Sequence, residues 1–224
     1  MDPDNINTRT FACYNFRPLF LLPVLIFLVS IGTFVICYSI ALSYGHILPT
    51  PSFPFISDTG ALPPESCIFG ELINGVAILI GIAIYLRHRE IMEYVRLAPS
   101  RHKIMRYCSY VFMFIGLLAA FGVSLVANFQ ENRVLTVHLI GAFMAFGVGV
   151  VYAWCQTVVS YIIGRRMCPL WMVILRIVFC LTCTGSFVSM NVCGHMRFNS
   201  TPPVKVPSSD PVRCKTVWLP PRPE

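Results

Sequence analysis

The chain has 224 residues, of which 56% are apolar and only 12% charged, a balance that excludes an ordinary water-soluble domain. Its formal net charge of +7 does not indicate nucleic-acid binding, because the basic residues lie between apolar runs instead of clustering on one surface. Lipid offers the backbone no hydrogen-bond partner, so membrane segments of this kind must be helical. We therefore expect an all-α, polytopic transmembrane helix bundle, with membrane lipids and no nucleic acid among its partners.

Five apolar runs are long enough to cross a bilayer, since a hydrocarbon core of about 30 Å takes roughly 20 helical residues. We expect a cytosolic N-terminus over residues 1–17, the helical bundle over 18–192 and a proline-rich, disordered tail over 193–224. The predicted spans cover residues 18–43, 69–86, 107–127, 134–163 and 170–192.

The positions of lysine and arginine predict the orientation of these spans. The loop between the second and third spans and the loop after the fourth are rich in arginine, whereas the first loop, Tyr44 to Cys67, has neither lysine nor arginine. Because short cytosolic loops carry the excess of positive charge, we expect the first and third loops to face the lumen or the outside. Five crossings then place the basic tail outside, against the same rule, where Asn199 would be a possible glycosylation site.

Polar residues near the outer ends of the spans are expected to meet in the bundle. Glu71 and Asn74 lie one helical turn apart in the second span, and we expect their shared face to point inward, away from lipid. The predicted luminal polar cluster, structural or binding in role, consists of Asp58, Glu65, Glu71, Asn74, Asn128, Gln130, Glu131 and His138. Two interpretations stay open: a network that orients the helix ends, and pH sensing by a histidine beside carboxylates.

Two features inside the spans have structural interpretations. Gly141, Ala145 and Gly149 recur every fourth residue and predict a face for close helix packing, within one chain or between two copies. Arg176 lies near the cytosolic end of the fifth span, where a long side chain extends to the headgroups.

The sequence carries none of the usual catalytic signatures, neither G-x-S-x-G, H-E-x-x-H nor a phosphate-binding glycine loop. Cys180 and Cys183 form a C-x-x-C inside a span, which we interpret as core packing because no second ligand pair accompanies it. We therefore expect no enzyme, no catalytic residue, no cofactor and no bound metal. Tyr94 and Leu97 fit a tyrosine-based sorting motif, although the same segment also fits a charged helical extension of the second span.

Several ordered motifs resemble the damage-regulated autophagy modulator (DRAM) family of multispan membrane proteins. They cover about residues 18–192 and occur in the expected spans. The matching residues are Pro54 to Gly60, Pro63 to Ser66, Ile68 to Gly70, Asn74, Ala127 to Glu131, His138, Gly141, Ala142, Ala145, Phe146, Gly149 to Tyr152, Gln156, Ser160 and Tyr161.

This resemblance implies a six-helix protein of lysosomal and related endosomal membranes that promotes autophagy, with other membrane or autophagy proteins as partners and no agreed catalytic residue. The chain departs from the family plan at its C-terminus, where a sixth span is expected and the proline-rich segment stands instead. Our leading hypothesis is a non-enzymatic lysosomal or endosomal membrane protein that modulates autophagy. The alternatives are an ion or proton transporter or channel accessory using Glu71 and His138, and a lipid-binding protein related to remodelling of GPI lipids.

Overall fold

The computed structural model describes residues 21–47, 55–97, 102–163 and 170–200. They form α2 (Leu21–Ser43), the short 3-10 helix η3 (Asp58–Gly60), α3 (Glu65–Leu97), α4 (His102–Asn128), α5 (Leu135–Ala142), the π-helix η5 (Phe143–Val148), α6 (Gly149–Ile163) and α7 (Leu170–Ser200). Five helical segments in the described part of the chain are long and apolar enough to cross a membrane, which confirms the predicted all-α, polytopic fold. One of them consists of α5, η5 and α6, which follow one another without a break.

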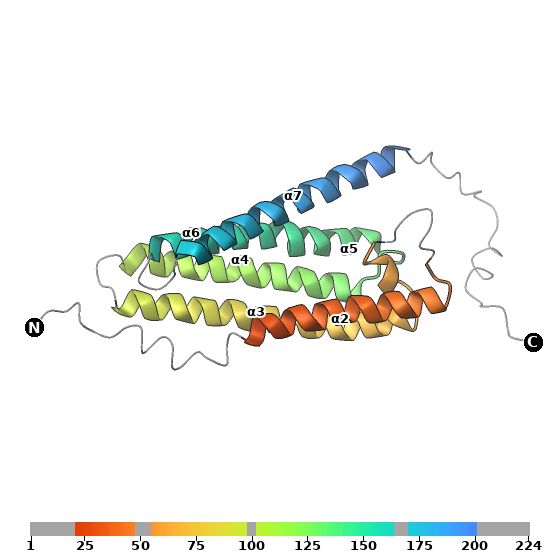
Figure 1. The fold of residues 1–224 in the computed structure, drawn as a ribbon, viewed down its shortest axis with the longest axis horizontal. Helices are drawn as coiled ribbons and strands as arrows, with labels where there is room; N and C mark the ends of the chain where they lie inside the picture. The colour runs from red at the N-terminus through yellow and green to blue at the C-terminus, as the bar shows by residue number, and fades with distance from the viewer. Residues whose placement is uncertain (1–20, 48–54, 98–101, 164–169, 201–224) are drawn as a thin grey trace, which may run out of the picture. The chain divides into compact units, whose positions relative to one another are not determined.

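The chain divides into two units, Met1–Thr184 and Gly185–Glu224. In the first unit α4 contacts α3 on one side and α5, η5 and α6 on another, while α2 packs on α3; Figure 1 shows α2, α3 and α4 running side by side. In the second unit the end of α7 is helical, with the Asn191 side chain donating to the Phe187 carbonyl at 2.7 Å.

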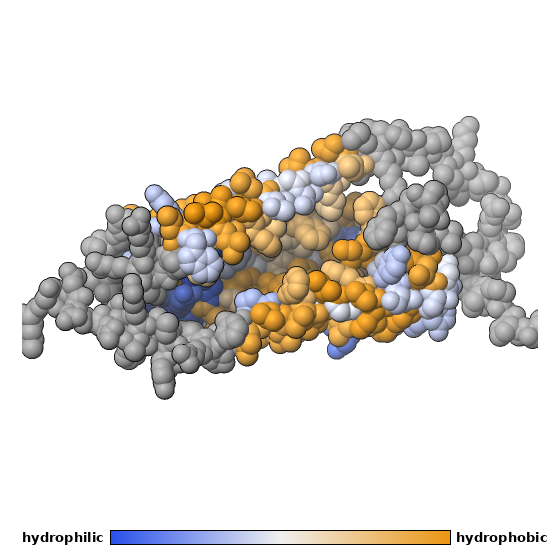
Figure 2. Space-filling view, viewed as in Figure 1, coloured by the Kyte–Doolittle hydropathy of each residue, from blue (hydrophilic) through white to orange (hydrophobic). Residues whose placement is uncertain are grey.

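Two small apolar clusters hold the bundle together at its two ends. One joins α2, α3 and α4 through Cys37, Phe69, Ile73 and Ala127, and the other joins α3 to α6 through Ile91, Val95, Val159 and Ile163. Many large apolar side chains remain exposed along the helices, and hydrophobic residues cover most of the visible helical surface in Figure 2. Lipid tails solvate such a surface, so the bundle is stabilised by packing between neighbouring helices and does not need a large apolar core.

The second span continues as a helix beyond its predicted end. Helix α3 runs from Glu65 through Leu97, because nothing between Leu86 and Pro99 breaks a helix and the residues before a proline disfavour helical geometry. Pairs of opposite charge three residues apart, Arg87 with Glu90 and Glu93 with Arg96, stabilise this extension. The length of the apolar run therefore predicts the membrane crossing, whereas the helix itself ends only where the sequence approaches a proline.

The C-terminal boundary of the bundle also differs from the prediction. Helix α7 runs through Ser200, so residues 193–200 are helical and not disordered as expected. The run of apolar residues ends at Val192, but the next proline, a residue that interrupts helices, is Pro202. Residues 1–20 and 201–224 lie outside the described part of the chain.

The predicted small-residue stripe lies against α4 within the same chain. A Cβ added at Gly141 would lie 2.8 Å from the Leu125 Cβ, and one added at Gly122 of α4 would lie 2.6 Å from the Ala145 amide nitrogen. At Gly149 the nearest atom, the Ala119 Cβ, is 3.9 Å away, an ordinary contact. The helices therefore approach most closely at Gly122 and Gly141, next to the π-helical segment.

Candidate functional site

The described part of the first loop, the first turns of α3, and the end of α4 with its connection to α5 lie at one end of the bundle (Figure 1). Polar side chains from these segments contact one another. We call their contacts the first-loop network. It consists of three sets: His46 with Glu65; Asn74 with Ser124 and Asn128; and Ser57 with Glu131 and His138.

Glu65 is the most deeply buried member of the network. Its side chain is 0% exposed, and its Oε1 lies 2.6 Å from Nδ1 of His46. Among the described residues, Glu65 Oε2 has no hydrogen-bond partner. A buried carboxylate costs free energy unless it is paired, so the contact with His46 compensates one oxygen and leaves the other uncompensated.

The end of α2 explains how His46 reaches this position. Gly45 has a φ of +70°, the left-handed conformation that glycine adopts without strain. Its amide donates to the Leu42 carbonyl at 3.1 Å, and the His46 amide donates to the Ala41 carbonyl at 2.8 Å. This is the Schellman arrangement that ends helices. It turns the chain back so that the histidine lies over the start of α3.

His46 is not among the residues predicted from sequence, where Glu65 belongs to the polar cluster without an assigned partner. The available signal is a glycine two residues after a helical span, followed by an ionisable residue in a loop that has neither lysine nor arginine. A Schellman end at Gly45 fixes the direction of the next residue, and in the structure that residue, His46, contacts the carboxylate of Glu65.

Asn74 of α3 and Asn128 of α4 form the second set. Each amide donates to the other's carbonyl oxygen at 3.0 Å, and the Ser124 hydroxyl donates to the Asn74 carbonyl oxygen at 2.7 Å. The Asn128 amide also donates to the Ser124 carbonyl at 2.7 Å. This set joins α3 to α4, and its member Ser124 is not among the residues predicted from sequence.

We expect the interaction between the Asn74 and Asn128 amides to contribute only a small amount to the free energy of unfolding. The double variant Asn74→Ala/Asn128→Ala, compared with the two single variants, should give a coupling free energy of about 0.6 kcal/mol, and below about 1.7 kcal/mol, as between helices in lipid. The measurement is reversible unfolding in mixed detergent micelles. Strict additivity of the two single effects would show that the bond between the two amides contributes nothing to holding α3 against α4.

The third set ties the first loop to the connection between α4 and α5. The Ser57 hydroxyl donates to a carboxylate oxygen of Glu131. His138 is buried and its Nδ1 lies 2.7 Å from the Phe129 carbonyl, which only an N–H at that position can satisfy. Its Nε2 lies 4.0 Å from a Glu131 oxygen. His138 therefore lies next to Glu131, while the hydrogen bond from Ser57 is what ties the Glu131 carboxylate to the first loop.

Three residues of the predicted cluster have other roles. Asp58 closes its own turn, accepting from the Phe55 amide at 2.8 Å, and the Gln130 main-chain carbonyl accepts from the amides of Arg133 and Val134. The expectation that Glu71 faces the bundle is wrong: Glu71 is exposed. At 100° per residue it lies about 200° around α3 from buried Phe69, on the opposite side of the helix. Glu71 therefore forms no shared site with His138 in the described part of the chain.

The remaining predicted residues lie elsewhere. Tyr94 is a half-buried residue of α3 whose hydroxyl lies 3.5 Å from the Ile163 carbonyl, which agrees with the helical-extension interpretation. Leu97 ends α3 and Asn199 lies near the end of α7, with both side chains outside the described part of the structure. Cys180 is buried, 3.4 Å from the Thr157 hydroxyl of α6, and Cys183 is half-buried.

An apolar surface and five helical segments long and apolar enough to cross a membrane define the chain as a multi-pass membrane protein. Residues 18–202 match the family described as the Frag1/DRAM/Sfk1/Cwh43P N-terminal domain, and the chain belongs to this family. The resemblance inferred from the sequence motifs is thus confirmed.

Curated relatives match most of this chain. It is 33% identical over 180 residues to DNA damage-regulated autophagy modulator protein 2 of Rattus norvegicus and 33% identical over 180 residues to modulator of macroautophagy TMEM150B-B of Xenopus laevis. It is 35% identical over 184 residues to DNA damage-regulated autophagy modulator protein 1 of Homo sapiens. Each match covers 80% of this chain, but only 65% of the rat protein and 74% of the other two. No solved structure matches the chain.

Proposed function

We propose that this chain modulates autophagy as a non-enzymatic, multi-pass protein of lysosomal or endosomal membranes. The observation that carries the proposal is the match of 80% of the chain to relatives named as autophagy modulators. The family match over residues 18–202 contains every member of the first-loop network. We propose further that the chain acts by contact with lipids or with other membrane proteins.

The geometry of the first loop supports a role in binding a partner. Ser57 and Glu131 hold the loop against the connection between α4 and α5, and Asp58 closes the turn next to it. The two residues before Ser57, Phe55 and Ile56, are large, apolar and exposed, at 45% and 53%. Apolar side chains held on an ordered loop form a surface that a partner can bind without first ordering it.

The test is deletion of the gene followed by rescue, with autophagic flux and co-localisation with lysosomal and plasma-membrane markers as readouts. We expect deletion to reduce flux, the full chain to restore it, and the tagged protein to overlap the lysosomal marker. Unchanged flux after deletion, or localisation confined to the plasma membrane, would contradict the proposal.

A matched pair of variants tests the contact role. Glu131→Gln weakens the tie between the first loop and the α4–α5 connection, whereas Glu71→Gln removes an exposed carboxylate outside the network. We expect Glu131→Gln to lose most of the rescue and Glu71→Gln to retain it at equal protein levels. Equal rescue by both variants would remove the first loop from the proposed function.

A further inference from the structure

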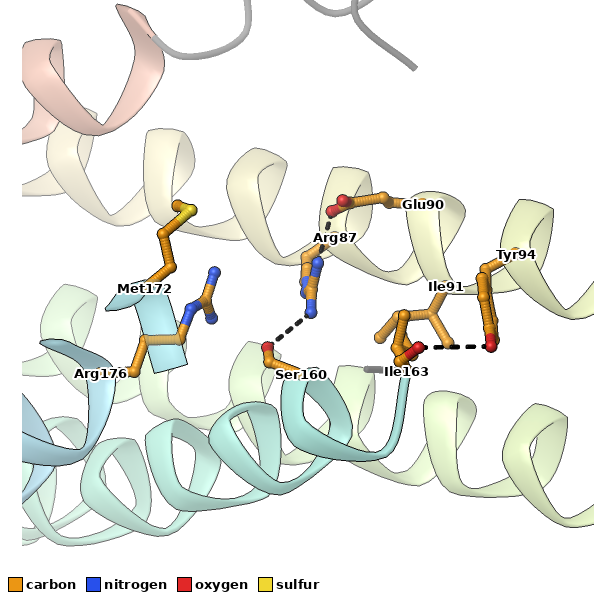
Figure 3. Close-up of a pocket in the computed structure, with 8 residues that line it drawn as sticks. All are labelled: Arg87, Glu90, Ile91, Tyr94, Ser160, Ile163, Met172 and Arg176. Atoms are coloured by element: carbon orange, nitrogen blue, oxygen red, sulfur yellow. Dashed lines mark hydrogen bonds and ion pairs between the residues drawn. The ribbon is translucent and has the colours of Figure 1, made fainter. Parts of the chain in front are cut away.

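A small polar cavity lies at the other end of the bundle, between α3, α6 and the first turns of α7. Its volume is about 80 Å³, and Figure 3 shows its lining residues. A cavity of roughly 10–15 Å³ by the same kind of measure already holds one water, so this one has room for a group of several atoms. Arg87 of α3 and Arg176 of α7 extend from different helices toward this shared space (Figure 3).

Arg87 is held in place by neighbours on two helices. Its Nε donates to Gln156 Oε1 at 3.2 Å, one terminal nitrogen donates to Ser160 Oγ at 3.0 Å, and the other donates to Glu90 at 2.6 Å. Only 19% of its side chain is exposed. A guanidinium has five N–H donors, so three are used and two are left on a group whose orientation is already fixed.

The charge of the cavity favours an anion. Two guanidinium groups line it and one carboxylate, Glu90, accompanies them, so the lining has a net positive charge. The hydroxyl hydrogen of Ser160 is used, because that group donates to the Gln156 carbonyl at 2.8 Å. Recognition of a ligand therefore falls to the guanidinium groups, whose flat forks match the oxygens of a phosphate.

The position of the cavity points to the source of that phosphate. It lies beside Ile163, where α6 ends, at the end of the bundle that the distribution of arginine places toward the cytosol. Trp171, Ile174 and Leu175 on the neighbouring turns of α7 are apolar and exposed, at 65%, 53% and 60%, as lipid-facing residues are. Basic pockets between membrane helices on the cytosolic side bind anionic headgroups.

We propose that this cavity binds a phosphate group, presented by an anionic phospholipid of the adjacent leaflet, between the guanidinium groups of Arg87 and Arg176. The acyl chains of that lipid lie along the exposed apolar side of α7. The inference rests on the cavity and its charges, and it holds whether or not the chain modulates autophagy.

The test is native mass spectrometry of the full chain in detergent, titrated with phosphatidic acid, with phosphatidylcholine and with inorganic phosphate. We expect phosphatidic acid to bind more tightly than either of the others. Arg87→Gln and Arg176→Gln should each weaken phosphatidic acid binding about tenfold or more, the size expected for a lost hydrogen bond to a charged group.

Arg89→Gln is the matched control, because Arg89 is two residues from Arg87 on α3, does not line the cavity, and bonds to the Tyr85 hydroxyl at 3.2 Å. It removes the same charge and should change affinity less than about twofold. Arg176→Gln decides the matter if Arg87→Gln fails to give a monodisperse protein, since the contacts of Arg87 to Gln156 and Ser160 also join α3 to α6.

Three outcomes would overturn the proposal. Equal losses in all three variants would mean general attraction to positive charge. Equal binding of phosphatidic acid and phosphatidylcholine would remove the anionic headgroup. Inorganic phosphate binding as tightly as phosphatidic acid would identify a solute site instead of a lipid site.

Discussion

Replacing His46 with alanine is expected to lower the free energy of unfolding of the bundle by about 3–5 kcal/mol. Glu65 is 0% exposed, and His46 is the only partner of its side chain among the described residues. Removing the imidazole leaves a buried carboxyl group with neither oxygen compensated, which is more costly than losing the pair as a whole. Reversible unfolding in mixed detergent micelles measures the loss.

The double variant His46→Ala/Glu65→Leu separates the cost of the unpaired carboxyl from the contribution of the pair. An apolar residue of similar size needs no partner, so we expect this variant to recover most of the lost stability. Glu71→Ala, on the exposed side of the same helix, should change stability by less than about 0.5 kcal/mol. If His46→Ala proves as mild as Glu71→Ala, the pair does not hold the first loop to α3.

Gly122→Ala is expected to destabilise the bundle by about 1–3 kcal/mol, although alanine is the better helix former. A Cβ at this position would lie 2.6 Å from the Ala145 amide nitrogen and 2.7 Å from the Gly141 carbonyl oxygen. Both atoms belong to the backbone, so no change of rotamer relieves the overlap and α4 must move away from the fourth span. A lower thermal midpoint of the detergent-purified chain, with loss of monodispersity, reports this change.

Gly75→Ala and Gly149→Ala serve as controls for Gly122→Ala. A Cβ at Gly75 meets no atom within 4 Å, and one at Gly149 meets only the Ala119 Cβ at 3.9 Å. Both substitutions should be neutral or stabilising by up to about 1 kcal/mol, from helix propensity alone. A thermal midpoint for Gly122→Ala as high as theirs would show that the helices separate at no cost.

The membrane fold follows from sequence because the bilayer imposes it. Runs of about 20 apolar residues can only cross as helices, and five such runs appear as five spanning segments. Helix ends are less predictable, because hydropathy locates the hydrocarbon core and not the point where the helix stops. Arg87 and His88 illustrate this: they follow the apolar run of the second span and look like loop charges, yet α3 continues through both.

The difficulty of predicting helix ends affects the prediction of polar contacts more than the prediction of the fold. His88 is buried, with its Nδ1 2.8 Å from the Ser109 hydroxyl of α4, and Arg87 bonds to two residues of α6. Neither contact is visible in a pattern that counts positive charge per loop. The pairing of Asn74 with Asn128 could be predicted from sequence, because both are amides expected at the same depth in the membrane. The orientation of Glu71 could not be predicted. Glu71 lies one helical turn from Asn74, but the two residues share one side of α3 only approximately.

The central place of α4 has a consequence for the order in which the bundle forms. Its partners α3 and α5 are its immediate neighbours in the chain, and its partner α6 belongs to the same membrane span as α5, after η5. Contacts between sequence neighbours close short loops and form quickly. The α2–α3–α4 part can therefore assemble while the fourth span is still being synthesised, and α4 waits with one side open to lipid. Substitutions on that side, Gly122 among them, should act late in biogenesis, after insertion and before the fourth span docks.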